Sequence, residues 1–214
     1  MNAEQTLQQR LDFVGLGPTE QARLRSLKGT IEKSIGPALA EFYTKLQTVP
    51  DTNAFFRDTT HMAHARDKQA EHWGVISSAD FGSQYVRNVQ TIGKTHARLG
   101  LEPRWYIGGY ARVTDGLLHA LVEAKWPKTP FAGGQTKAKD LGDDLGVVVK
   151  AAMLDMDLAI SIYLEAIEEK RAEAEALRLA EQAEQEHAMA ALASALARLA
   201  VGDLTASMDA QVSP

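Results

Sequence analysis

The sequence predicts an all-α protein with two parts: a compact helical domain over residues 1–165 and a helical extension over residues 166–214. Two observations support this fold class. Apolar residues recur at helical spacing in nearly every segment, and no stretch alternates like a half-buried strand between hairpin turns. From residue 168 to residue 200, alanine, glutamate, arginine and leucine dominate and proline and glycine are absent. That composition is typical of a long helix or coiled coil.

The first half of the compact domain divides into helices at its prolines. A short helix is expected near the N-terminus, and Pro18 opens a second one. We expect the Gly36-Pro37 step to break that helix and to start another, which Pro50 closes. A helix of mixed polarity follows over residues 59–76.

The second half contains the strongest helical pattern, in residues 80–99. One face of this segment carries Tyr85, Val89, Ile92, His96 and Leu99. Gly100 is suited to end the helix, and Pro103 starts the next. The side chains expected to point inward from that next helix are Ile107, Ala111, Thr114, Leu118 and Leu121. A very long helix then begins near Lys137 and is expected to stop at Gly202.

Composition and charge exclude several classes of function. A net charge of −5 disfavours nucleic-acid binding, and the lack of cysteine excludes disulfides, zinc-thiolate sites and iron–sulfur clusters. The sequence has neither a run of about 18 apolar residues nor the apolar core of a signal peptide, so we expect no membrane span and a cytoplasmic location. Phosphate-binding glycine loops, serine nucleophile elbows and zinc-protease motifs are also missing.

His96 is the first candidate for chemistry, because it lies within an apolar helical stripe. A neutral imidazole that faces a core needs a partner for its nitrogens. One interpretation, which physical reasoning alone favours, is a core histidine bonded to a backbone carbonyl. The other is an axial ligand to haem iron, which requires an imidazole projecting into an apolar slot.

Tyr43 and three histidines are further candidates. Tyr43 lies on the apolar face of its helix, either as a core aromatic or as a hydrogen-bond donor to a ligand on iron. His61, His64 and His72 have a helical spacing that could assemble a metal site. However, their segment is polar and lacks an acidic residue on the matching face, which favours solvated surface histidines. A sixth ligand to haem iron is the alternative for one of them.

Residues 92–110, IGKTHARLGLEPRWYIGGY, resemble the globin-coupled sensor family. Members carry a histidine, a short Gly-Leu step, a proline and then a Trp-Tyr-Ile/Met-Gly run. Three shorter segments resemble other parts of the family in the right order: FVGL at 13–16, PALAEFYTKLQTVP at 37–50 and AEHW at 70–73. The resemblance covers much of the chain, and the His-to-Trp-Tyr motif is its most specific part.

This resemblance implies a globin-like sensor domain that holds haem b, and it assigns roles to individual residues. His96 matches the proximal ligand of the haem iron, and Tyr43 matches the distal tyrosine that hydrogen-bonds bound oxygen. Tyr106 matches a tyrosine close to the haem on the proximal side. Phe56 is the candidate to wedge the haem near the corner after the second core helix.

The resemblance also places Ala65 and Lys68 where the distal helix faces the iron. Other members often have a larger apolar residue or a hydroxyl residue at these places, so this sequence departs from the family pattern there. The family's second distal contact therefore has no clear counterpart in this sequence. Lys68 reaching a haem propionate is the alternative.

The C-terminal stretch LASALARLAVGDLTASMD resembles the second half of a HAMP-type linker, common in methyl-accepting chemotaxis proteins. Its Gly-Asp step suits a helix end followed by a new helix cap, although a plain helix stop is the other interpretation. The resemblance implies a chemotaxis transducer output that is absent from this chain, with a sensor kinase or a diguanylate cyclase as alternatives. We also expect a homodimer through the long C-terminal helices.

Together these inferences predict a haem-based sensor of oxygen or another diatomic gas, and not an enzyme. The main alternative from another class is a haem-free globin-like interaction module, against which the intact motif around His96 argues. A peroxidase-like or nitric-oxide-consuming haem enzyme ranks lower, because the sequence offers no reductase domain and no clear acid–base pair.

Overall fold

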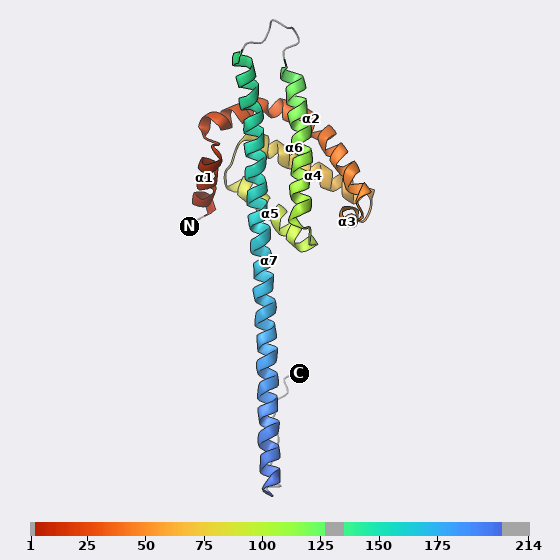
Figure 1. The fold of residues 1–214 in the computed structure, drawn as a ribbon, viewed down its shortest axis with the longest axis vertical. Coiled ribbons are helices and arrows are strands. Elements are labelled where there is room, and N and C mark those ends of the chain that lie inside the picture. Colours follow the sequence, from red (N-terminus) through yellow and green to blue (C-terminus); the bar gives the residue numbers. More distant parts are fainter. Residues whose placement is uncertain (1–2, 127–134, 203–214) are drawn as a thin grey trace. The chain divides into compact units, whose positions relative to one another are not determined.

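The computed structural model describes residues 3–126 and 135–202. Within these ranges every regular element is a helix, which confirms the predicted all-α class (Figure 1). The helices are α1 (Ala3–Val14), α2 (Pro18–Thr48), α3 (Pro50–Asn53), α4 (Thr59–Ser78), α5 (Ser83–Leu99), α6 (Pro103–Lys125) and α7 (Gln135–Ala200). None of the described helices is both long enough and apolar enough to span a membrane.

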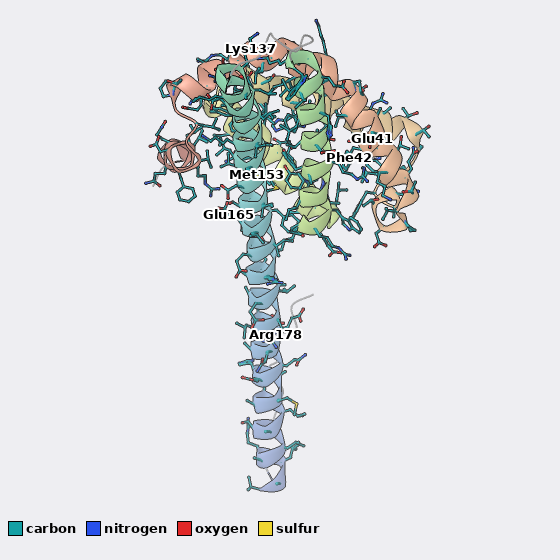
Figure 2. All side chains as sticks on the ribbon, turned by 45° about the horizontal axis from the view of Figure 1, so that its top comes forward. Glu41, Phe42, Lys137, Met153, Glu165 and Arg178 are labelled. Carbon is teal, nitrogen blue, oxygen red and sulfur yellow. The ribbon has the colours of Figure 1, made fainter. Side chains whose placement is uncertain are left out.

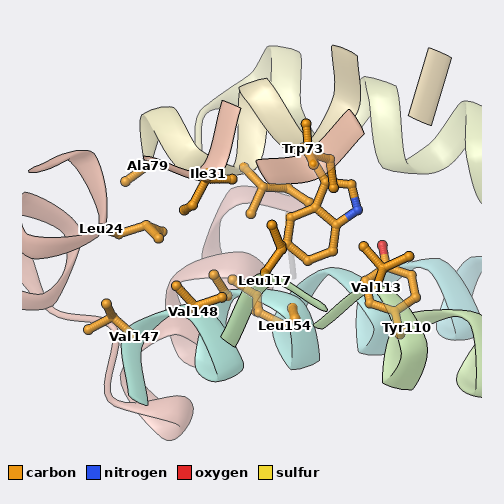
Figure 3. Close-up of a cluster of buried hydrophobic side chains, with 14 of the residues drawn as sticks. Leu24, Ile31, Trp73, Ala79, Tyr110, Val113, Leu117, Val147, Val148 and Leu154 are labelled. Carbon is orange, nitrogen blue, oxygen red and sulfur yellow. The ribbon is translucent and has the colours of Figure 1, made fainter. Parts of the chain in front are cut away.

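The chain divides into two compact units, Met1–Leu164 and Glu165–Pro214. The core of the first unit is one contiguous cluster of apolar side chains from every helix except α3. Trp73 of α4 packs there near Leu117 of α6 and Leu154 of α7 (Figure 3). All three side chains are almost fully buried. Burial of one such side chain contributes about 1.5–3 kcal/mol relative to leaving it in water.

The predicted break at Gly36-Pro37 does not occur, because α2 continues through it as a single helix with Pro37 inside. Proline removes the hydrogen bond to the carbonyl of Lys33. Lys33, Gly36 and Pro37 are all exposed, so water can reach that carbonyl. The buried stripe meanwhile runs unbroken from Ile31 through Ile35 to beyond the proline. Packing along this stripe thus outweighs the local cost of the proline.

The other predicted helix ends lie within about three residues of the observed ones. Of the side chains predicted to point inward from α6, Ile107 and Ala111 do not. Ile107 is 46% exposed and Ala111 is also exposed. The side chains that α6 buries are Tyr110, Val113, Thr114, Leu117 and Leu121. Thr114 and Leu121 were predicted to point inward, and Leu118 packs partly buried against the core, so the prediction is wrong only in the first half of the helix, where Tyr110 is the buried side chain.

Three glycines set how closely two pairs of helices approach. A Cβ added at Gly109 would lie 2.9 Å from the ring of Phe42, the α2 residue labelled in Figure 2. One added at Gly116 would lie 2.9 Å from the side chain of Ala38, also on α2. At Gly93 the added atom would lie 2.9 Å from the carbonyl oxygen of Ala159 on α7. Helix α6 therefore packs tightly on α2, and α5 packs tightly on α7.

In the second unit, residues 165–200 are helical and bury no side chain. Arg178 and the other side chains of this segment project outward on all sides (Figure 2). The exposed apolar side chains include Leu177, Leu179, Met189, Leu192, Leu196 and Leu199. Gly202 follows the helix at a φ of 84°, in agreement with the predicted stop. The rest of the HAMP-like stretch lies outside the described residues.

Candidate functional site

A cavity of about 750 Å³ lies within the first unit, and residues of α2, α4, α5 and α6 line it. Five of the six site residues predicted from the sequence line this cavity: Tyr43, Ala65, Lys68, His96 and Tyr106. They come from four different helices, so the fold brings together residues that are distant in the sequence. Aromatic and aliphatic side chains make up much of the remaining wall, among them Phe42, Leu46, Phe55, Val75, Ile92 and Trp105.

Phe56, the sixth predicted residue, is not part of the cavity lining. Its ring packs against Tyr43, with centroids 6.0 Å apart, and against His61, with centroids 5.8 Å apart. The preceding residue, Phe55, lines the cavity instead. Phe56 thus supports Tyr43 from outside the cavity.

His96 lies in the last turn of α5, which Gly100 ends in the left-handed conformation at a φ of 71°. Neither ring nitrogen of His96 forms a hydrogen bond with any residue that the structure describes. Its ring instead makes an edge contact with the ring of Tyr106, with centroids 4.9 Å apart. Burial lowers the pKa of His96 to about 4, so the imidazole is neutral at pH 7. A neutral ring nitrogen without a hydrogen-bonding partner is suited to bind a metal ion.

Tyr43 presents a second polar group to the cavity, from α2. The residue is buried, and its ring packs edge-on against Phe42, with centroids 5.3 Å apart. Burial raises the pKa of Tyr43, so its hydroxyl keeps its proton at neutral pH. No hydrogen bond links this hydroxyl to another described residue. The cavity therefore contains an unused hydrogen-bond donor.

Helix α4 contributes Ala65 and Lys68, both in the cavity lining. Lys68 Nζ donates a hydrogen bond to Glu71 Oε2 at 2.7 Å, and both side chains are more than half exposed. Lys68 is therefore at the solvent edge of the cavity, where its charge is hydrated. Ala65 is half-buried and leaves the wall without a bulky side chain at that point.

The three histidines of α4 do not assemble a metal site. Throughout the part of the chain that the structure describes, no group of three or more His, Cys, Asp or Glu side chains could hold a metal ion. His64 is exposed and lines the cavity, and His61 packs on Phe56. His72, in contrast to the sequence-based expectation of a solvated side chain, is buried.

A buried hydrogen-bond chain beside the cavity was not predicted from the sequence. His72 Nε2 lies 2.9 Å from both carboxylate oxygens of Asp155 on α7. The hydroxyl of Tyr110 donates a hydrogen bond to Asp155 Oδ2, and the hydroxyl of Tyr106 donates to that of Tyr110 at 3.3 Å. One feature of the sequence could have indicated this chain: Asp155 is a carboxylate on the buried face of α7, between Ala152 and Ala159.

These features fit a flat, largely apolar cofactor that carries one metal ion. The cavity offers a neutral imidazole at His96 and an unpaired hydroxyl at Tyr43, while its other walls are mainly aromatic and aliphatic. Ligand sites of this kind are typically apolar with a few polar groups that set orientation. An iron porphyrin needs one imidazole in such a slot.

The helical fold and its histidine-lined cavity define a globin-type domain. Residues 3–169 match the model of the Protoglobin family, so the chain belongs to the protoglobin family. The fold is similar to the solved globin domain of the Geobacter sulfurreducens globin-coupled sensor, with a TM-score of 0.62 and 17% identity. That similarity covers 73% of this chain and 96% of the solved one.

A curated relative is the heme-based aerotactic transducer HemAT of Halobacterium salinarum. The two sequences are 30% identical over 115 residues, which make up 53% of this chain and 24% of the transducer. The match therefore spans about a quarter of that relative's length. With the family model and the structural match, it confirms the predicted resemblance to globin-coupled sensors.

Proposed function

We propose that this chain is a haem-based sensor of a diatomic gas and that the cavity of the first unit holds haem b. The observation that carries the proposal is His96, a neutral imidazole in an apolar cavity with no described hydrogen-bonding partner. Haem iron, when bound, supplies a coordination position for a small gas molecule. His96 is the proposed protein ligand of that iron, and Tyr106 holds the imidazole ring at one edge.

Tyr43 gives the proposed site a preference among gases. Its protonated hydroxyl is a donor for a ligand that gains negative charge on its outer atom, as oxygen does on binding. Carbon monoxide gains less charge and benefits less from a donor. Oxygen is therefore the proposed ligand. The small side chain of Ala65 leaves space in the cavity. Lys68, which pairs with Glu71 at the cavity edge, is the proposed partner of a carboxylate of the cofactor.

The proposed role is binding and signalling without a chemical reaction. The relative from Halobacterium salinarum is a transducer for aerotaxis, which supports an output of the chemotaxis type for this chain as well. The exposed apolar side chains of residues 165–200 support a homodimer formed by paired helices. A kinase or a diguanylate cyclase is the alternative output.

Visible absorption spectra of the purified protein test the cofactor. We expect a Soret band that shifts reversibly when the reduced protein meets oxygen. Removing the imidazole with His96→Ala should abolish stable haem binding. The control is His119→Ala, because His119 is three-quarters exposed and lies outside the cavity lining.

Two outcomes would contradict the proposal in different ways. Normal haem content in the His96→Ala protein would show that another residue binds the iron. A wild-type protein without a Soret band, even after haem is added, would favour the haem-free interaction module on the same fold.

A further inference from the structure

Helix α7 places one fully buried carboxylate against the cavity wall. Asp155 is 0% exposed, and a buried carboxylate is costly unless it is paired and hydrogen-bonded. Its partners are His72 on α4 and Tyr110 on α6, and both of these residues line the cavity. A single side chain of α7 is therefore bonded to two walls of the cavity.

The same carboxylate is connected to His96 through two tyrosines. Tyr110 receives a hydrogen bond from Tyr106, whose ring makes the edge contact with the imidazole of His96. Any shift of that imidazole would push on Tyr106 directly. The chain of contacts from His96 to Asp155 thus crosses from α5 through α6 to α7.

A third tyrosine, Tyr85, lies against His72, the side chain that contacts Asp155. The hydroxyl of Tyr85 on α5 is buried and has no hydrogen-bonding partner among the described residues. Its ring stacks on that of His72 with an interplanar angle of 4°, and burial and the charge of Asp155 raise the pKa of Tyr85. A buried unpaired hydroxyl is rare and calls for an explanation.

The two hydroxyls come from different helices. Tyr110 belongs to α6, while Tyr85 belongs to α5, the helix that carries His96. The carboxylate of Asp155 accepts from the hydroxyl of Tyr110, while the hydroxyl of Tyr85 is unpaired. Two hydrogen-bonding arrangements are therefore available, one with each tyrosine as the donor. Movement of α5 relative to α6 would favour one of them.

We propose that Asp155 is a positioning residue that links the cavity to α7 by exchanging its hydroxyl donor between Tyr110 and Tyr85. The inference rests on the proposed haem-binding function. When the cavity changes on gas binding, α5 shifts, the bonding at Asp155 changes, and α7 repacks in the surrounding segment. The linked residues are His96, Tyr106, Tyr110, Asp155 and Tyr85.

The chain offers a matched control in Asp144, a second buried aspartate of α7. Asp144 Oδ1 accepts from Arg23 Nη1 at 2.9 Å, and Oδ2 accepts from Lys125 Nζ at 2.6 Å. None of these three residues lines the cavity. Asp144→Asn therefore disturbs a buried ion pair of α7 without touching the proposed link.

Hydrogen exchange of α7 amides between residues 148 and 164 tests the proposal. Exchange is compared in the haem-free protein, in the reduced haem-loaded protein under argon, and in the same protein under oxygen. In the wild type we expect exchange rates in this segment to change by about fivefold or more on oxygen binding, which is the usual lower range of coupling between sites. Asp144→Asn should retain that change.

Two substitutions should remove the change while haem and oxygen still bind. Asp155→Asn keeps the size of the side chain, but it replaces one of the two accepting oxygens with an amide nitrogen, which donates and cannot accept from a tyrosine hydroxyl. Tyr85→Phe removes only the unpaired hydroxyl, so a purely structural role of Asp155 predicts no effect of this variant. We expect both variants to respond to oxygen by less than about twofold, which is below the usual range of coupling between sites.

The outcomes separate this inference from the proposed function. A wild-type response in Asp155→Asn or in Tyr85→Phe would overturn the link, even with a normal Soret band. Failure of the wild type to bind haem would overturn the proposed function instead. If Asp155→Asn does not fold, Tyr85→Phe decides the question alone.

Discussion

At the scale of single residues, a few polar side chains in an apolar cavity determine what the fold can bind. His96 and Tyr43 have no described hydrogen-bonding partner, while His72 and Asp155 satisfy each other. The first pair is therefore available to a ligand, whereas the second pair is already hydrogen-bonded within the protein. This division follows from the requirement that buried polar groups find partners.

Replacing Tyr43 with phenylalanine should speed the release of oxygen. The change removes one hydrogen bond to a partly charged ligand, worth about 1.5–3 kcal/mol, so the dissociation rate should rise about tenfold or more. Stopped-flow measurements on the reduced protein give this rate, and carbon monoxide release should change much less. Tyr163→Phe, a change outside the cavity lining, is the control. Equal rates in Tyr43→Phe and the wild type would remove Tyr43 from the gas site.

The haem-free protein should lose stability in mild acid because of His96. Burial lowers the pKa of His96 from 6.5 to about 4, so between these values the unfolded chain binds a proton that the folded chain does not. This group's contribution to the free energy of unfolding is fully present above about pH 6.5 and decreases as the pH falls. From pH 6.5 to pH 5 the loss is about 1.5 kcal/mol.

Urea unfolding of the haem-free protein at several pH values measures this loss. His96→Leu removes the titrating group and should reduce the decrease between pH 6.5 and pH 5 by the same amount. His119→Leu, at an exposed position, should leave the wild-type decrease unchanged. A His96→Leu protein with the wild-type pH dependence would show that this imidazole titrates normally.

At the scale of helices, the sequence predicts most boundaries but not every contact face. Gly100 and Pro103 mark the end of α5 and the start of α6, because their backbone preferences act locally. The continuity of α2 through Pro37 depends on packing along its whole length, which the local signal does not include. The buried face of α6 depends on Tyr110 finding Asp155, 45 residues further along the chain.

Gly93→Ala should separate α5 from α7. The new Cβ would lie 2.9 Å from the carbonyl oxygen of Ala159 and 2.9 Å from the side chain of Ile162, and a backbone oxygen cannot rotate away. Overpacking of this kind costs about 1–3 kcal/mol, which exceeds the helix-propensity gain of alanine over glycine. Urea unfolding should show a net loss of stability.

Gly108→Ala is the matched control for that prediction. Gly108 lies inside α6, is exposed, and has no atom within 4 Å of an added Cβ. Alanine there should be neutral or should stabilise the protein by up to about 1 kcal/mol. If Gly93→Ala were equally well tolerated, the close approach of α5 and α7 would not constrain the fold.

At the scale of the whole molecule, the first unit buries its apolar residues and the second leaves them exposed. Met1–Leu164 has its own core, whereas no side chain of residues 165–200 is buried. An exposed helix with spaced leucines is stable in water only when its apolar side is covered. We propose that residues 165–200 of a second chain cover this apolar side.

Substitutions on this exposed helix should weaken self-association. Leu192, Ala195 and Leu199 recur at heptad spacing and form an apolar stripe. Leu192→Glu places a charge on this stripe, and the dimer dissociation constant should rise at least about tenfold. Ala190→Glu lies off that stripe and should have little effect. Sedimentation analysis of the full chain over a concentration series measures both. A monomeric wild type would disprove pairing through this segment.

The candidate site could be predicted from the sequence only in part. His96, Tyr43 and Tyr106 were found because a family motif surrounds them, and all three line one cavity. Asp155 has no such motif, and its partner His72 lies 83 residues away in the sequence. Contacts of that range follow from the arrangement of whole helices, which no local pattern contains. The sequence analysis predicted Phe56 at the cavity wall, but the structure has its neighbour Phe55 there. Local patterns therefore do not resolve which of two adjacent aromatic residues faces the cavity.

The positions of the tryptophans should make the intrinsic fluorescence of the protein sensitive to whether haem occupies the cavity. Trp73 is buried in the core, Trp105 lines the cavity, and Trp126 is 63% exposed. Haem absorbs where tryptophan emits, so a haem in the cavity would quench the fluorescence of its nearest indoles by energy transfer. Titration of the haem-free protein with haem can therefore be followed by the loss of its intrinsic emission, without a label.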